Sequence, residues 1–296
     1  MFPLYVLYFV VRRRHKHIQE ETMETEIITV YCRCDDFLIS VNHQDDPQSR
    51  MSTAEVMTTA LTAAIFFSGD HEKSRHFLKE YGHIPEMLSK SQFSRRLHRI
   101  PEALWIAFMN MIARTAHSGN PLKIYLIDSF PVPVCHNIRI KRSRIYQGEE
   151  FRGYNPSKRV YFYGLKTHLL ISESGLPVEL FFSPGSYSDT SSLYDFTFPL
   201  PEGSFVYGDK AYNVYGVEDE LKDREIHLMP VRKKNSKRKY DTLTERGIKY
   251  IRKRIESVFS VIEQKFPKHI HAVTPKGFEL KTLMFILAYG IQASMS

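Results

Sequence analysis

Cysteine, tryptophan and long apolar runs are scarce in this 296-residue chain, which has three cysteines and one tryptophan. Cys32, Cys34 and Cys135 are odd in number, and two of them are one residue apart, which excludes an ordinary disulfide framework and indicates a reducing compartment. With His136 they could be drawn as a zinc site, but the paired C-x-x-C spacing is missing. We therefore expect buried free thiols.

A short apolar run, Phe2 to Val11, precedes three arginines near the N-terminus. The run is too short to span a bilayer, and its charges follow it, which is the wrong side for a secretory signal. Two interpretations of residues 1–24 stay open: a helix that touches a membrane, and an extension from an upstream start codon with Met23 as the alternative start.

Positive charge is in excess and unevenly spread, with a formal net charge of +8 and a pI near 9.2. Residues 131–160 hold seven Lys/Arg against two Glu, and residues 222–254 hold thirteen against four acids. Two such basic patches favour a polyanionic partner such as nucleic acid. A solvated charged face is the alternative.

Helical periodicity extends over residues 25–118. Within it, a glycine-containing turn is followed by Ser89, a good N-cap, and by a basic helix over Lys90–Arg99. This pattern is typical of a helix-turn-helix, in which Arg95 and Arg96 would contact DNA. The alternative is an ordinary helical hairpin with surface arginines.

Strand-like patterns begin after residue 118, and two short apolar strands each end in an acid. Asp128 follows Ile124–Ile127, and Asp209 follows Phe205–Gly208. If these strands are parallel and adjacent, both carboxylates lie at one edge of the sheet, where they either share a metal or repel each other.

A third acid lies on an amphipathic helix predicted over residues 247–266. Glu256 is beside the apolar stripe and can face the sheet edge, whereas a simple Arg252–Glu256 helix pair is the alternative. Asp189 follows Ser188 and is expected to start a helix, with a role as reserve carboxylate.

The remaining candidate phosphate contacts are cations of the two basic patches, several of them among aromatic residues. They are Arg139, Lys141, Arg142, Arg144, Lys158 and Arg159 in the first patch, and Arg232, Lys233 and Lys234, with Arg252 on the helix, in the second.

The element order predicts an α/β fold: a ribonuclease-H-like mixed five-stranded sheet with flanking helices, preceded by an all-α N-terminal region. The predicted divisions are residues 1–24, a leader; 25–118, helical; and 119–296, the sheet domain.

From about Thr25 to its end, the chain resembles DDE transposases of bacterial insertion sequences, most closely the insertion-sequence 982 family. The resemblance is carried by IDSFPVPVCHNIRI, SKRVYFYGLKTHL, PVELFFSPGSYSD, YGDKAY, PVRKKNSKR and RKRIESVFSVIE. It implies that Asp128, Asp209 and Glu256 form a catalytic triad that binds two Mg²⁺ or Mn²⁺ ions, with Asp128 bridging them. The ions would activate water, and then a DNA 3′-hydroxyl, for in-line phosphoryl transfer.

The resemblance also implies double-stranded DNA as partner, both element ends and target, and a homodimer on that DNA. We expect a cytoplasmic, nucleoid-associated protein with no stable membrane partner. The broader family signature, Tyr-x2-Arg-x3-Glu-x6-Lys, is met at Arg252 and Glu256, but Glu263 stands where the lysine is expected. This makes Glu263 a weaker rival for the third ligand.

Two other functions stay open at this point. A metal-dependent nuclease would hydrolyse DNA without joining it. A catalytically silent DNA-binding protein derived from such an element would keep only the binding surfaces.

Overall fold

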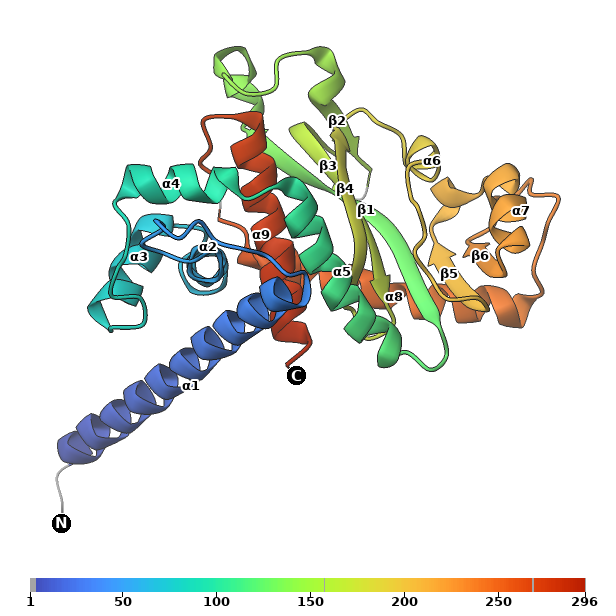
Figure 1. Cartoon of the computed structure of the whole chain (residues 1–296). Helices are drawn as coiled ribbons and strands as arrows, with labels where there is room; N and C mark the ends of the chain where they lie inside the picture. The colour runs from blue at the N-terminus through green and yellow to red at the C-terminus, as the bar shows by residue number, and fades with distance from the viewer. Residues whose placement is uncertain (1–3, 157, 268, 296) are drawn as a thin grey trace. The chain divides into compact units, whose positions relative to one another are not determined.

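The chain divides into two compact units, Met1–Ile100 and Pro101–Ser296, in a computed structural model that describes residues 4–156, 158–267 and 269–295 (Figure 1). The sequence predicted the division at residue 118. Instead α5 (Glu102–Ser118) belongs to the second unit, because its buried face packs on the sheet strand β4 (Pro177–Pro184). No helix among the described residues is long and apolar enough to cross a membrane.

The described part of the first unit consists of helices without a strand. They are α1 (Leu4–Ser40), α2 (Thr53–Phe66), α3 (His71–Glu80) and α4 (Lys90–Arg99). Small threonines and alanines let α2 be buried over most of its length, so it forms the centre of this unit, with α1, α3 and α4 in contact with it.

The predicted basic helix is confirmed as α4, with the expected bounds and the expected cap. The Ser89 hydroxyl accepts a hydrogen bond from the backbone N–H of Gln92, and the side-chain oxygen of Gln92 accepts one from the Ser89 N–H. Phe93 and Leu97 are the buried residues of this helix. The connection from α3 runs over Tyr81–Ser89, longer than the roughly three- or four-residue turn of a helix-turn-helix.

The second unit is built on one mixed sheet of six strands, where the sequence predicted five. Its strands are β1 (Ile124–Cys135), β2 (Arg152–Asn155), β3 (Val160–Ser172), β4 (Pro177–Pro184), β5 (Ser204–Gly208) and β6 (Ile226–Pro230). The order is β2-β3-β1-β5-β6, and β4 also pairs with β3. β1, β5 and β6 are parallel, whereas β2, β3 and β4 form antiparallel pairs.

The extra strand lies within the first basic patch, residues 131–160. There β1 continues past Asp128 to Cys135, because Phe130 and Val132 are buried while the strand stays paired with β3. β2 then adds four residues to β3. β2 was missed because its RGYN sequence has no apolar alternation.

Helices cover both faces of this sheet (Figure 1). On one face, Tyr125 and Ile127 pack with residues of α5 and α7 (Tyr215–Asp223). On the other, Phe130 meets Phe259 of α8 (Thr242–Lys265), with ring centroids 4.8 Å apart. α9 (Pro275–Ala293) packs on α8 and β4. Alternation along β1 therefore turns Asp128 toward the α8 side.

Candidate active site

The structure places Asp128 and Asp209 side by side, as the strand pattern predicted. β1 and β5 are adjacent and parallel, and Leu126 is in register with Tyr207. Each aspartate lies two residues beyond its member of that pair, so both carboxylates leave the carboxyl ends of neighbouring strands at the same level. This is the edge of the sheet at which open α/β folds bind ligands.

Arg252 joins the two carboxylates. From α8 its guanidinium donates through Nη1 to Asp209 Oδ1 at 3.1 Å and through Nη2 to Asp128 Oδ2 at 3.4 Å. The arginine side chain is 15% exposed, and its buried Nε has no hydrogen-bond partner in the described chain. One positive charge thus faces two negative ones.

The environment of Asp128 disfavours its charged form. Burial is the main cause that raises its pKa, from 3.8 to about 6, and the negative charges of Asp189 and Asp209 act in the same direction. A hydrogen bond from the Ser129 N–H, at 2.8 Å from Oδ1, and the charge of Arg252 only partly oppose this. Asp128 is therefore an acid whose charge is incompletely compensated.

A third aspartate, Asp189, lies next to this pair. It is the first residue of α6 (Asp189–Ser192), and Ser188 caps that helix, so the Asp189 carboxylate is free for other partners. Its Oδ1 accepts hydrogen bonds from Ser129 Oγ at 2.7 Å and Lys166 Nζ at 3.2 Å. The expected helix start is confirmed, and the carboxylate is neutralised by its own lysine.

Tyr212 is a buried residue close to the three aspartates. It follows Asp209 on a 3-10 helix, Lys210–Tyr212, and is completely buried. Burial, then the charges of Asp128 and Asp189, raise the pKa of its hydroxyl, which has no hydrogen-bond partner among the described residues. Only glycine fits easily beneath it, since a Cβ on Gly208 would come 3.0 Å from both Ile127 and the tyrosine ring.

Glu256 does not join the aspartates. It lies on α8 one turn beyond Arg252, but its side chain is exposed, and no polar partner for it is present in the described ranges. Among residues 4–156, 158–267 and 269–295, no group of three His, Cys, Asp or Glu side chains is placed to hold a metal. Its rival Glu263 pairs with Lys158 at 2.9 Å instead.

Most of the predicted phosphate contacts lie on the surface. The exposed ones are Arg95, Arg139, Lys141, Arg142, Arg144, Lys158, Arg159, Lys233 and Lys234. Arg139, Lys141 and Arg142 share one 3-10 helix, Asn137–Arg142, which is exposed over most of its length.

Arg232 is buried, which contradicts the prediction that it contacts a phosphate. Its side chain is 4% exposed, binds both carboxylate oxygens of Glu218 at 2.7 Å, and stacks on Tyr240. A guanidinium enclosed in this way cannot reach a phosphate. Glu218 and Arg232 are fourteen residues apart, so no local pattern reveals the pair.

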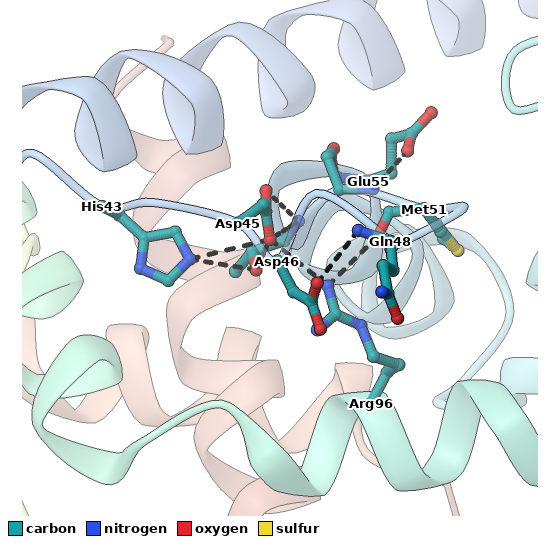
Figure 2. A network of polar contacts seen from close by, with 9 residues as sticks. His43, Asp45, Asp46, Gln48, Met51, Glu55 and Arg96 are labelled. Carbon is teal, nitrogen blue, oxygen red and sulfur yellow. Dashed lines mark hydrogen bonds and ion pairs between the residues drawn. The ribbon is translucent and has the colours of Figure 1, made fainter.

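Arg96 is also held internally, within the first unit. It donates to Asp45 Oδ1 at 3.3 Å and to the Met51 carbonyl at 3.1 Å (Figure 2). Asp45 also accepts from the backbone and hydroxyl of Thr53, the first residue of α2. Arg96 thus fastens α4 to the loop before α2.

Comparisons with known proteins identify the family of the chain. A family model described as the transposase DDE domain matches residues 118–271, which include all of β1 to β6. A solved structure, the cryo-EM piggyBac transposase synaptic complex with hairpin DNA, is similar at 10% sequence identity and a TM-score of 0.43, covering 90% of this chain and 71% of that one. No curated protein matches. The match over residues 118–271 spans more than half of the chain, which therefore belongs to the DDE transposase family and is a DDE-type transposase.

Proposed function

We propose that this transposase moves a bacterial insertion sequence, of the kind represented by the insertion-sequence 982 family, by cutting the element ends and joining their 3′-hydroxyls to target DNA. The observation that carries this proposal is the pair Asp128 and Asp209, which end adjacent parallel strands and share one cationic partner. The sheet supports a ribonuclease-H-like description, since β1 to β4 form antiparallel pairs and β5 and β6 extend the sheet parallel to β1.

The two aspartates suit a hard divalent cation. They offer carboxylate oxygens, the ligands that Mg²⁺ and Mn²⁺ prefer, and their two negative charges exceed the single charge of Arg252. When bound, such ions would activate the attacking hydroxyl and stabilise charge on the phosphate. We assign Asp128 and Asp209 as the ligands, with two ions as the working number.

Glu256 would complete the ligand set only by turning its exposed side chain toward the aspartates. Its position one turn beyond Arg252, on the helix that already reaches them, supports that assignment. Asp189 is held by Lys166 and is assigned a supporting position beside Asp128.

Double-stranded DNA is the proposed substrate, and the exposed cations named above would contact its phosphates. The piggyBac relative was solved with DNA in a synaptic complex. Two element ends must be handled together, so we propose a homodimer on DNA. Residues 1–24 are assigned as a leader, and the helices from residue 25 to the end of α4 as a DNA-binding region.

The decisive experiment uses purified full-length protein, Mg²⁺ or Mn²⁺, and DNA that carries the terminal repeats of the element. Wild type should cleave the ends and transfer the strand. Asp209→Ala should abolish both reactions while DNA binding persists. The control is Asp223→Ala, an exposed carboxylate at the end of α7, which should retain both reactions.

Two results would change the conclusion. Cleavage that survives in Asp209→Ala would remove the aspartate pair from the reaction. Cleavage by wild type without strand transfer would favour a nuclease that only hydrolyses DNA.

A further inference from the structure

Arg252 occupies the place between Asp128 and Asp209 that a divalent cation needs. Its two terminal nitrogens each face a different carboxylate, at 3.1 and 3.4 Å. Lys166, the cation paired with neighbouring Asp189, is committed to that carboxylate and to the Tyr187 carbonyl. Of the described side chains, only Arg252 has an ion pair with either aspartate of the pair.

The guanidinium and a metal ion exclude each other at this position. Mg²⁺ binds carboxylate oxygens at about 2.0 to 2.1 Å, so an ion shared by both acids would lie within the space now spanned by the guanidinium. Two like charges at such range also repel strongly. A cation therefore enters only when Arg252 leaves at least one of its acids.

A released Arg252 has two places to go. Glu256, four residues further along α8, is exposed and lies on the neighbouring turn of the helix. The two non-bridging oxygens of a phosphate on a bound DNA strand would together offer a two-point acceptor, as the two aspartates do. The unpartnered Nε gives the guanidinium a further donor for either acceptor.

We propose that Arg252 is an internal placeholder cation, which pairs with Asp128 and Asp209 in the metal-free protein and is displaced onto the DNA backbone when a divalent ion binds. This inference rests on the proposed function. It adds that the cation affinity of the site is set by competition with a residue of the chain itself. The site would consequently load its metal more readily once a DNA phosphate is at hand to accept Arg252.

The test measures Mn²⁺ binding without DNA, by electron paramagnetic resonance of the free ion at pH 8, where Asp128 with its pKa of about 6 is ionised. The Asp128→Asn/Asp209→Asn double variant supplies the background. Arg252→Gln removes the competing charge, Arg252→Lys keeps it, and Lys253→Gln removes the charge of the exposed neighbouring residue of α8.

We expect Arg252→Gln to bind Mn²⁺ about tenfold more tightly than wild type, since an opposite charge at this range alters the affinity of a carboxylate for protons by about ten- to a thousandfold. Arg252→Lys and Lys253→Gln should stay within about threefold of wild type. Unchanged or weaker binding by Arg252→Gln overturns the proposal. So does equal tightening by Lys253→Gln, because the effect would then be unspecific charge.

A measurement on the wild type avoids any effect of the substitution on folding. In ¹⁵N-labelled protein, the Arg252 Nε–H resonance, assigned through Arg252→Lys, should shift when Mg²⁺ saturates the site. A resonance that does not move at saturation overturns the placeholder role. The proposed function fails by a different result: no Mn²⁺ binding above the double-variant background and no DNA cleavage by wild type.

Discussion

An aspartate is paired with an arginine in each unit of this protein, and the two pairs differ in how fully the acid is satisfied. The side chains have similar exposed fractions, 31% for Asp45 and 23% for Asp128, but Asp128 lies deeper in the protein, so burial disfavours its charged form more strongly. Asp45 accepts hydrogen bonds from the backbone and hydroxyl of Thr53 and from Arg96 (Figure 2). Asp128 has one backbone N–H and shares its arginine with Asp209.

The pKa values follow this difference. Burial acts to raise the pKa of Asp45, yet the hydrogen bonds from Thr53 and Arg96 outweigh it, and the pKa is lowered from 3.8. For Asp128 burial prevails, and the pKa rises to about 6. A satisfied acid stabilises structure, whereas an acid left short of positive charge is ready to accept a ligand.

The largest effect should come from neutralising Asp128. Asp128→Asn is expected to lower DNA strand cleavage by at least roughly a thousandfold, because the site loses a ligand and half of its negative charge. The same change should raise the melting temperature of the metal-free protein at pH 8, because a poorly compensated charge is removed. The measurements are gel-based cleavage and thermal unfolding in EDTA.

A lower melting temperature for Asp128→Asn than for wild type would show that Asp128 stabilises the fold as Asp45 does. The proposed difference between the two acids would then be wrong.

Removing Asp45 should affect stability alone. Asp45→Ala leaves the Thr53 N–H and the Arg96 guanidinium without their partner and should destabilise the first unit by about 1 to 3 kcal/mol. Hydrogen exchange at the start of α2 localises the loss, since a protein of two units need not unfold in a single transition. Mn²⁺ affinity at Asp128 and Asp209 should not change.

An exchange rate at the start of α2 equal to that of wild type would show that the Asp45 network contributes nothing measurable.

Lowering the pH should change the contributions of Asp128 and Asp45 to the free energy of unfolding in opposite directions. The folded pKa of Asp128 lies above 3.8, so the folded protein holds the extra proton between about pH 4 and 6, and its contribution to stability falls as pH rises through that window. The folded pKa of Asp45 lies below 3.8, so its contribution is present above about pH 4 and is lost on further acidification.

Thermal unfolding in EDTA from pH 3 to 8 tests this. Compared with wild type, Asp128→Asn should be less sensitive to pH between pH 4 and 6. Asp45→Asn should be less stable than wild type above about pH 4, and the difference should shrink as the pH falls further, because wild type then loses the contribution of Asp45. Parallel curves for all three proteins would contradict the assignment.

The sequence predicted the backbone of the site better than its side-chain contacts. The apolar runs before Asp128 and Asp209 specify buried parallel strands, and the stripe on α8 specifies the helix that faces them. These are local patterns with a known period. The pairing of Arg252 with both aspartates was not predicted, because residues 43 and 124 positions apart meet only through the tertiary fold.

The same limit explains the errors among the basic residues. Arg232 stands in a run with Lys233 and Lys234, and the sequence does not distinguish the three. Only the fold shows that Arg232 is enclosed by Glu218 while Lys233 and Lys234 are exposed.

The start of α8 was also predicted wrongly. The helix begins at Thr242, five residues before the predicted start, because Asp241 accepts hydrogen bonds from the backbone of Leu243 and Thr244.

The smallest effect concerns Glu263, the residue that stands where the family signature expects a lysine. Its pair with Lys158 has side chains 35% and 59% exposed, and exposed ion pairs contribute about 0 to 1 kcal/mol. Glu263→Gln should therefore change stability by less than about 0.5 kcal/mol and leave cleavage intact, whereas Glu256→Gln should lose cleavage. If Glu263→Gln loses cleavage and Glu256→Gln keeps it, the third ligand is Glu263, further along α8 than Glu256. The carboxylate brought to the aspartates would then be the one that pairs with Lys158 in this structure.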